Sequence, residues 1–304
     1  MAFALFFFSI LATGYVLAGY PLLLGYLASR HPRPVKRGNT LRSVSVIIPV
    51  HNGAEFLRRK LESVFAAGYP AELLEILVAS DGSTDKTESI AEEFQAQGVK
   101  LLRLPRGGKP AALNAAAALA SGEILVLADV RQSIESGSIH KLVSYFDDSQ
   151  VGVVSGELVL MQGSQHDHAD IGLYLRYEIW IRRRLSQLDS MFGATGALYA
   201  IRRNLFVSIP EDALLDDMYL PMRAFFRGYR LLIEEDARTF DDHVSRDREF
   251  QRKARTLGGN YQLLWLLPQL LSFKNRMLWH FLSYKVGRLL LPWFLICALV
   301  SSCF

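Results

Sequence analysis

Apolar residues dominate both ends of the chain, whereas its middle alternates short apolar runs with amphipathic segments. Residues 2–27 contain no charged side chain, and about 20 apolar residues suffice to cross a hydrocarbon core of ~30 Å. Positive charges, among them Arg30, Arg33 and Lys36, follow this run, whereas a signal peptide carries them before a shorter apolar core. We therefore predict a transmembrane anchor over residues 1–29, and the positive-inside rule places the chain after it in the cytoplasm.

The C-terminal apolar run, residues 289–304, is short and predicts one marginal membrane span. Lys285 and Arg288 precede it, which again puts positive charge on the cytoplasmic side of the entry point. Residues 261–273 are too short to cross a membrane and are rich in Leu and Trp, so they form either a helix in the membrane interface or a helix buried in the core. We group residues 261–304 as an interfacial helix and a C-terminal membrane segment.

Between these ends, strand-like runs alternate with helix-period segments in a regular way. The turn-forming residues of 30–42 predict a linker, and residues 43–260 are expected to form one α/β domain. Strand–helix alternation predicts a mostly parallel sheet with helices on its faces and a ligand crevice at the carboxyl ends of the strands. The predicted strands are 44–50, 73–79, 99–104 and 124–128, and the predicted helices are 56–67, 85–97 and 110–120.

Composition narrows the partners of this domain. Half of the residues are hydrophobic, and the formal net charge is +4 with a pI near 9.0. Lys and Arg gather beside the apolar ends and form no basic stripe, so membrane lipids are expected as partners and nucleic acid is not. The two cysteines, Cys297 and Cys303, lie in the C-terminal apolar run, which argues against a disulfide-built secreted domain. The spacing of His166 and His168 does not form a convincing metal site.

Two motifs follow predicted strands and offer groups for a nucleotide. In "SDGSTDKT", Asp81 can accept hydrogen bonds from a base edge, while Ser83 or Asp85 is suited to cap the next helix. In "RGGKPAALN", the spacing does not match a Walker A loop, because Arg103 stands where its first glycine would be. Lys109 at this helix start can meet a diphosphate, or it can be a solvated surface lysine.

Further acidic and basic residues are candidates for metal binding, base catalysis and phosphate binding. Asp129 ends an apolar strand as a candidate hard-metal ligand, but Arg131 occupies the position where a second acid would strengthen the site. Asp216 and Asp217 begin an amphipathic helix, where acids either cap the helix or supply a catalytic base. The cations of "QRKART", which include Arg252 and Arg255, can face a pyrophosphate leaving group or lipid headgroups.

In their order along the chain, these motifs resemble family 2 glycosyltransferases, specifically the membrane-anchored branch related to cellulose, chitin and hyaluronan synthases. The resemblance covers about residues 43 to 260 and rests on the whole set. The matching segments are "VSVIIPVHNGAEFLRRKLES", "ILVASDGSTDKT", "GGKPAALN", "GEILVLADVRQ", "GATGALYAIRR", "DDMYLPMRAFFRGYR" and "QRKART".

The resemblance implies a GT-A fold that binds a nucleotide-diphospho-sugar, usually a UDP-sugar, with Mg²⁺ or Mn²⁺, and transfers the sugar with inversion to a saccharide or lipid-linked acceptor. Asp217 matches the general base, with Asp216 as its neighbour, and Asp129 matches the first acid of a D-x-D metal motif. The remaining matches are Asp81 for the base of the nucleotide, Pro49, His51 and Asn52 for the turn beside the nucleotide, Lys109, Arg131, Arg252 and Arg255 for the donor, and Gly193, Thr195 and Gly196 for the acceptor.

Two departures from the family pattern shape these expectations. Arg131 replaces the second D-x-D acid, which puts the metal in question and lets Arg131 itself neutralise phosphate. Thr256 replaces the tryptophan of the Q-x-x-R-W motif, which favours addition of one or a few sugars over processive polymerisation. A polyprenyl-phosphate glycosyltransferase and an inactive membrane-anchored sugar-nucleotide binding protein stay open as alternatives.

Overall fold

The computed structural model describes residues 2–161, 173–242 and 246–303. His166 and His168 lie outside this part of the chain. Within it, eight strands form one mixed sheet in the order β3-β2-β1-β4-β7-β6-β8-β5. The first four strands in this order are parallel, β7 is antiparallel to both β4 and β6, β8 is parallel to β6, and β5 is antiparallel to β8. The strands are β1 (Val44–Val50), β2 (Leu74–Asp81), β3 (Val99–Leu104), β4 (Ile124–Leu127), β5 (Ser133–Ile134), β6 (Val151–Met161), β7 (Tyr199–Arg202) and β8 (Arg230–Asp242).

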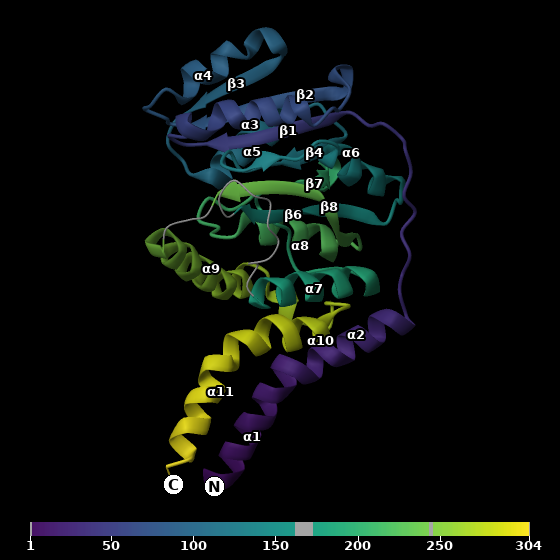
Figure 1. Cartoon of the computed structure of the whole chain (residues 1–304), viewed down its shortest axis with the longest axis vertical. Helices are drawn as coiled ribbons and strands as arrows, with labels where there is room; N and C mark the ends of the chain where they lie inside the picture. Colours follow the sequence, from purple (N-terminus) through teal and green to yellow (C-terminus); the bar gives the residue numbers. More distant parts are fainter. Residues whose placement is uncertain (1, 162–172, 243–245, 304) are drawn as a thin grey trace.

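Helices cover both faces of this sheet (Figure 1). Every residue of β1 is buried, because its alternate side chains enter two separate cores. Ile47 packs in one core with α5, α7 and α8, whereas Val46 and Ile48 pack in the other with α3, α4 and α6. The α-helices on the sheet are α3 (Ala54–Ala66), α4 (Thr87–Glu93), α5 (Lys109–Leu119), α6 (Ser138–Val143), α7 (Leu173–Leu188) and α8 (Asp216–Phe226), and the 3₁₀ turns are η2 (Ala71–Leu73), η3 (Gln95–Gln97), η4 (Ser144–Asp147) and η6 (Arg203–Leu205).

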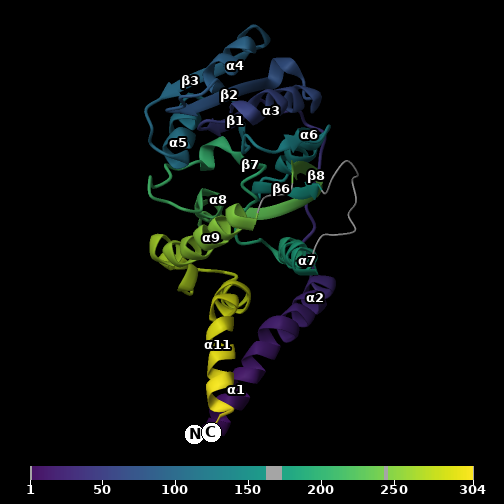
Figure 2. The ribbon, with the colours of Figure 1, turned by 60° about the vertical axis from the view of Figure 1, so that its left-hand side comes forward.

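Two helical stretches extend from one end of the domain. By length and composition, Ala2–Arg30 with 29 residues and Leu278–Ser301 with 24 residues are able to cross a membrane. Their outer parts, α1 and α11, lie side by side, and both ends of the chain lie at the far end of this pair (Figures 1 and 2). The stretches consist of α1 (Ala2–Gly14), the π-turn η1 (Tyr15–Gly19) and α2 (Tyr20–Arg30), and of α10 (Leu278–Phe281), the π-turn η8 (Leu282–Val286) and α11 (Gly287–Ser301).

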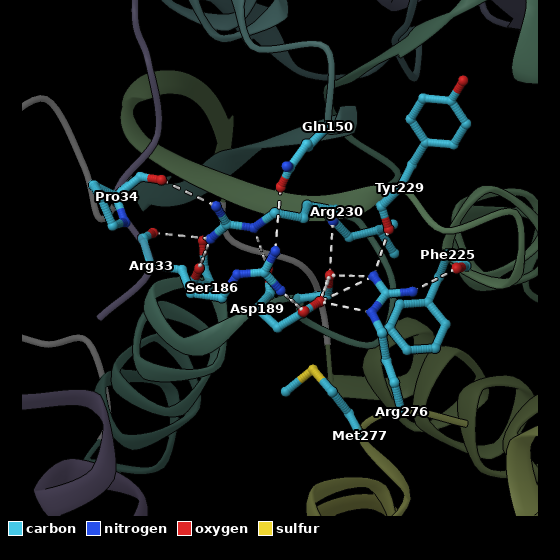
Figure 3. A network of polar contacts seen from close by, with 12 residues as sticks. Arg33, Pro34, Gln150, Ser186, Asp189, Phe225, Tyr229, Arg230, Arg276 and Met277 are labelled. Carbon is cyan, nitrogen blue, oxygen red and sulfur yellow. Dashed lines mark hydrogen bonds and ion pairs between the residues drawn. The ribbon is translucent and has the colours of Figure 1, made fainter. Parts of the chain in front are cut away.

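An arginine network around Asp189, which follows α7, fixes these stretches to the domain (Figure 3). Its carboxylate pairs with Arg33 of the linker and, at 2.9 Å, with Arg276 ahead of α10. Arg230 at the start of β8 is buried and donates to the Asp189 carbonyl oxygen at 3.0 Å and to that of Arg33 at 3.1 Å. Arg276 also lies over the ring of Phe225, with its guanidinium 3.8 Å from the ring centre. The network therefore joins the linker, α7, β8 and the segment before α10.

The predicted strands of the parallel half are confirmed within two residues at each end, and the α/β class is confirmed with them. The prediction of a separate helix at 261–273 was wrong. The preceding helix, α9 (Arg246–Leu266), continues through the boundary at 260, and a 3₁₀ turn, η7 (Pro268–Leu271), follows, because Pro268 cannot extend an α-helix. Both expected environments occur: Leu263 and Leu270 are buried in the core, whereas Trp265 is 79% exposed.

The C-terminal helical stretch is longer than the predicted apolar run. It begins at Leu278 and not near residue 289, so it incorporates Lys285 and Arg288, which were expected to precede it. At the other end of the linker, α2 continues through Arg30, and residues 32–43 contain no regular element. The linker runs along the outside of the domain to β1 (Figure 1).

Candidate active site

A cavity of about 360 Å³ lies beside the carboxyl end of β4 and brings together most of the predicted site residues. Its walls come from the turns after β4 and before β7, from the starts of α5 and α8, and from α7, α9 and η8. Four predicted residues, Pro49, His51, Asn52 and Asp81, do not line it. The predicted residues that do are Lys109, Asp129, Arg131, Gly193, Thr195, Gly196, Asp216, Asp217, Arg252 and Arg255.

Lys109, the first residue of α5, links the two acidic parts of this cavity. Its Nζ lies 2.9 Å from Oδ1 of Asp129 and 3.1 Å from Oδ2 of Asp216. Desolvation alone lowers the pKa of Lys109, but the charges of Asp129, Asp216 and Asp217 outweigh it and raise this pKa well above its ordinary value. The Lys109 ammonium therefore stays charged, and it is a partner of the acids and not a solvated surface lysine.

Asp217 lies in the first turn of α8 but does not have the low pKa that a helix start alone would give it. Burial, the negative charge of Asp216 and that of Asp129 raise its pKa to about 6, while Lys109 and Arg255 oppose this rise. A carboxyl with a pKa near 6 is ionised at neutral pH and accepts a proton better than an ordinary aspartate. This property suits the general base that the sequence predicted at Asp217.

Gly196 lies close to the carboxylates of both Asp129 and Asp217. A Cβ at this position would lie 3.1 Å from Oδ2 of Asp217 and 3.5 Å from Oδ2 of Asp129. The loop that carries it is fixed at both sides, because Ala194 donates to the Asp217 carbonyl oxygen at 2.7 Å and Thr195 donates to the Ser155 hydroxyl at 2.9 Å. The absence of a side chain therefore keeps both carboxylates open to the cavity.

Asp81 belongs to a neighbouring cluster that supports the loop before Lys109. Its carboxylate, 96% buried, accepts hydrogen bonds from the backbone N–H groups of Gly107 and Gly108 at 2.7 and 3.0 Å and pairs with Arg106. The Asp81 carbonyl lies 2.8 Å from Nδ1 of His51. A nucleotide base that bonds this carboxylate would have to displace the Arg106 side chain.

The turn after β1 is tied to the turn after β2 rather than to the cavity. Asn52 adopts a positive φ of 49° and accepts a hydrogen bond from the Thr84 N–H at 2.8 Å. Asp85 precedes the N-cap residue of α4, Lys86, and its side chain accepts the N–H of the first helical residue, Thr87, at 2.9 Å. Pro49 lies inside β1, paired with Ala79.

Asp129 and Arg131 test whether the site suits a divalent metal. Arg131 lines the cavity and donates from Nε to Asp241 at 2.7 Å, so its charge is already paired with a carboxylate. Among the residues that the structure describes, no group of three His, Cys, Asp or Glu side chains could hold a metal ion. Asp129 nevertheless supplies a carboxylate on the cavity wall, and Mg²⁺ is typically bound by one or two carboxylates together with water and substrate phosphates. The residues therefore fit a metal held mainly by a bound diphosphate.

Several cavity residues were missed by the sequence analysis. Glu178 and Arg182 of α7, and Tyr284 and Lys285 of η8, line the cavity together with Asp217. The packing of α7 and the C-terminal stretch brings these residues to the cavity, and no local sequence pattern predicts this packing. A lysine inside an apolar helical run was the available signal, and it was interpreted as a membrane-flanking charge alone.

Comparison with known proteins agrees with this geometry. A model of glycosyl transferase family 2 matches residues 45–208, more than half of the chain. Glycosyltransferase AglE of Haloferax volcanii is 35% identical over 76% of this chain and 77% of its own length. The probable glycosyltransferase YdaM of Bacillus subtilis is 25% identical over 78% of this chain, and the match spans 60% of that relative's length.

The fold has solved counterparts as well. The mannosyltransferase PcManGT of Pyrobaculum calidifontis, solved with GDP-Man and Mn²⁺, superposes with a TM-score of 0.78 at 23% identity and covers 99% of this chain and 86% of that one. The fold is thus the mixed α/β, Rossmann-like GT-A fold. The chain belongs to glycosyl transferase family 2.

Proposed function

We propose that this chain transfers a sugar, with inversion, from a nucleotide-diphospho-sugar to a saccharide or lipid-linked acceptor at the cytoplasmic face of a membrane. The observation that carries the proposal is the cavity in which Asp217, with its pKa raised to about 6, faces Lys109 and the arginines of α9. The sequence motifs favour a UDP-sugar, whereas the solved relative PcManGT holds GDP-Man. We also propose a relationship to the membrane-anchored cellulose, chitin and hyaluronan synthases.

In the proposed reaction, Asp217 takes the proton from an acceptor hydroxyl. The oxygen of that hydroxyl attacks the anomeric carbon of the donor sugar. The bond from that carbon to the diphosphate breaks on the opposite side, and the nucleoside diphosphate leaves with the bonding electrons. Lys109, Arg252 and Arg255 line the cavity and offset the negative charge that develops on the leaving group. A divalent metal bound at Asp129 would neutralise the same charge.

The remaining residues receive binding roles. Asp81 is proposed to bond the base after Arg106 moves away, beside the turn formed by Pro49, His51 and Asn52. The loop of Gly193, Thr195 and Gly196 is proposed to line the acceptor, because it forms part of the cavity wall beside Asp217 and Thr195 bonds Arg182 of α7.

Nucleotide release from a panel of UDP- and GDP-sugars, measured on the full-length protein in detergent, tests the proposal. We expect one of these sugar nucleotides to release its nucleotide only when an extract that contains the acceptor is added. The rate of this release should fall strongly in Asp217→Asn. Release that is equal in both proteins would contradict the catalytic assignment. Binding of a sugar nucleotide with no transfer would favour the inactive binding protein, and a radiolabelled lipid-phosphate sugar as product would favour the polyprenyl-phosphate glycosyltransferase.

A further inference from the structure

The side of the active-site cavity that faces the membrane stretches carries two cations that form no ion pair with any acid in the described part of the chain. Arg182 donates to the Thr195 hydroxyl at 3.0 Å and to the Ser155 hydroxyl at 3.1 Å, and both acceptors are neutral. Lys285 makes no hydrogen bond or ion pair with any residue the structure describes, and its ammonium lies 5.1 Å from the centre of the Tyr284 ring. Both side chains line the cavity that contains Asp217.

The nearby acid, Glu178, acts on Lys285 through its charge but makes its bonds to other residues. The carboxylate of Glu178 accepts the Tyr284 hydroxyl on one oxygen and pairs with Arg288 on the other. Partly buried charges are costly without a counter-charge. The two cations therefore form a site of positive potential that a ligand can satisfy.

This site is separate from the cations that face the leaving group. Lys109 is held between Asp129 and Asp216 at the start of α5, and Arg252 and Arg255 come from α9. In contrast, Arg182 and Lys285 come from α7 and from η8, the π-turn at the head of the membrane-capable stretch Leu278–Ser301. Figure 1 shows α7 and α10 next to each other between the sheet and the α1–α11 pair.

The position of Arg182 and Lys285 indicates which kind of ligand supplies the negative charge. Tyr284 and Lys285 lie on one turn of helix, and the same stretch continues into α11 with its exposed apolar residues Leu290, Trp293 and Leu295. A ligand with a negatively charged head in the cavity and an aliphatic tail along this stretch matches both features. Arginine and lysine are the usual partners of phosphate oxygens.

We propose that Arg182 and Lys285 bind a phosphate group of a lipid-linked acceptor and thereby hold the reacting hydroxyl of that acceptor beside Asp217. This inference rests on the proposed function, since it names the acceptor of that site as an anionic lipid. Arg182 connects the phosphate to the acceptor loop through its bond to Thr195, so the bound lipid also fixes the loop that borders the base.

Binding measurements on the full-length protein in detergent micelles test the site without transfer chemistry. The probes are a long-chain isoprenyl monophosphate and the matching isoprenyl alcohol, which differ in the phosphate alone. We expect the isoprenyl phosphate to bind at least about tenfold more tightly than the alcohol. Lys285→Gln or Arg182→Gln should lower the affinity for the phosphate by about tenfold to a hundredfold, as for the loss of hydrogen bonds to charged groups. Lys285→Arg should retain the preference.

Lys274→Gln is the matched control, because Lys274 is an exposed lysine ahead of the same stretch and does not line the cavity. Equal affinity for the phosphate and the alcohol, or an equal loss in Lys274→Gln and Lys285→Gln, would overturn the proposal. Competition by millimolar inorganic phosphate that abolishes lipid binding would assign the site to free phosphate and overturn the lipid assignment.

The outcome is distinguishable from failure of the proposed function. If sugar is transferred to a neutral acceptor and Lys285→Gln leaves both transfer and lipid binding unchanged, the phosphate site is wrong while the glycosyltransferase stands. If the isoprenyl phosphate binds through Lys285 but no sugar donor is consumed, the phosphate site stands while the proposed function is wrong.

Discussion

At the scale of single residues, charge and burial decide the state of Asp217. A helix start favours an ionised acid, by about 0.3–1 kcal/mol at exposed positions. In this cavity, burial and the neighbouring carboxylates act in the opposite direction and raise its pKa to about 6. The result is a carboxylate that is charged at neutral pH but retains an appreciable proton affinity, which a residue with only a capping role would not require.

Asp217→Asn is predicted to lower kcat by ~10²–10⁴-fold, because the amide cannot accept the proton of the acceptor hydroxyl. Donor affinity should barely change, since the amide has nearly the shape of the carboxylate. Steady-state turnover and donor binding by titration check both expectations. Asp216→Asn should cost less. If the acids only cap the helix, unfolding free energy instead falls by ~0.5–2 kcal/mol with normal turnover.

Lys109→Met is predicted to shift the pH dependence of kcat/KM. Activity should rise with pH as the base loses its proton near pH 6, and Lys109 lowers the pKa of this base through its positive charge. Without that charge the acidic limb should move to higher pH, by on the order of one pH unit. Lys109→Arg, which keeps the charge, should leave the limb near pH 6. If the acidic limb of Lys109→Met stays at the same pH, Lys109 does not lower the pKa of the base.

At the scale of elements, the loop before β7 packs against the carboxylates of Asp129 and Asp217. Gly196→Ala is predicted to lower kcat/KM by on the order of tenfold to a hundredfold, because its Cβ would press on Asp217 Oδ2 at 3.1 Å and misplace the base. Thermal stability should change little, since φ at this position is not positive. Gly258→Ala on α9, where the nearest atom to a Cβ is 3.9 Å away, is the control and should retain activity.

The junction between the linker, α7 and α10 is predicted to depend on Asp189. Burial raises the pKa of this carboxyl, but its bonds to Arg276 and Ser190 and the charge of Arg33 lower it below the ordinary value. Its stabilising contribution is therefore present above about pH 4 and is lost as pH falls.

Asp189→Asn should reduce the free energy of unfolding at pH 7 by about 2–4 kcal/mol, because Arg33 and Arg276 lose their acidic partner. Denaturant unfolding of the detergent-solubilised protein at pH 7 measures the loss. Asp212→Asn, an exposed acid, should leave stability unchanged. Equal stability of the two variants would show that the network does not hold the junction.

At the scale of the whole molecule, the paired helical stretches place both chain ends on one side of the domain (Figure 2). If both stretches cross a membrane, residues 2 and 303 lie together on the side opposite the catalytic domain. Protease is predicted to cut within residues 31–277 in inside-out vesicles and to leave this region intact in sealed right-side-out vesicles. Labels at residues 2 and 303 should show the reverse accessibility. Cleavage of the domain from the outside would overturn the proposed orientation.

The sequence alone determined those features that depend on near neighbours along the chain. Continuous apolar runs set the parallel strands, which are buried on both faces, and period-3.6 apolar patterns set their helices, each of which buries one face. Uninterrupted apolar composition marked the N-terminal membrane-capable stretch and only the outer part of the C-terminal one, beyond Arg288. Strand-end polar residues, Asp81 and Asp129 among them, were found because strands in a parallel sheet end at a common edge.

The tertiary structure decided everything that needed residues distant in sequence to meet. The sequence could not show that Lys109 would meet Asp129 after β4 and Asp216 of α8, or that burial and these charges together would shift the pKa of Asp217. It could not show that Arg106 would pair with the Asp81 carboxylate, or that η8 would bring Lys285 to the cavity that contains Asp217. Electrostatic shifts and cavity walls depend on distances across the fold, whereas local patterns record only which face of an element is apolar.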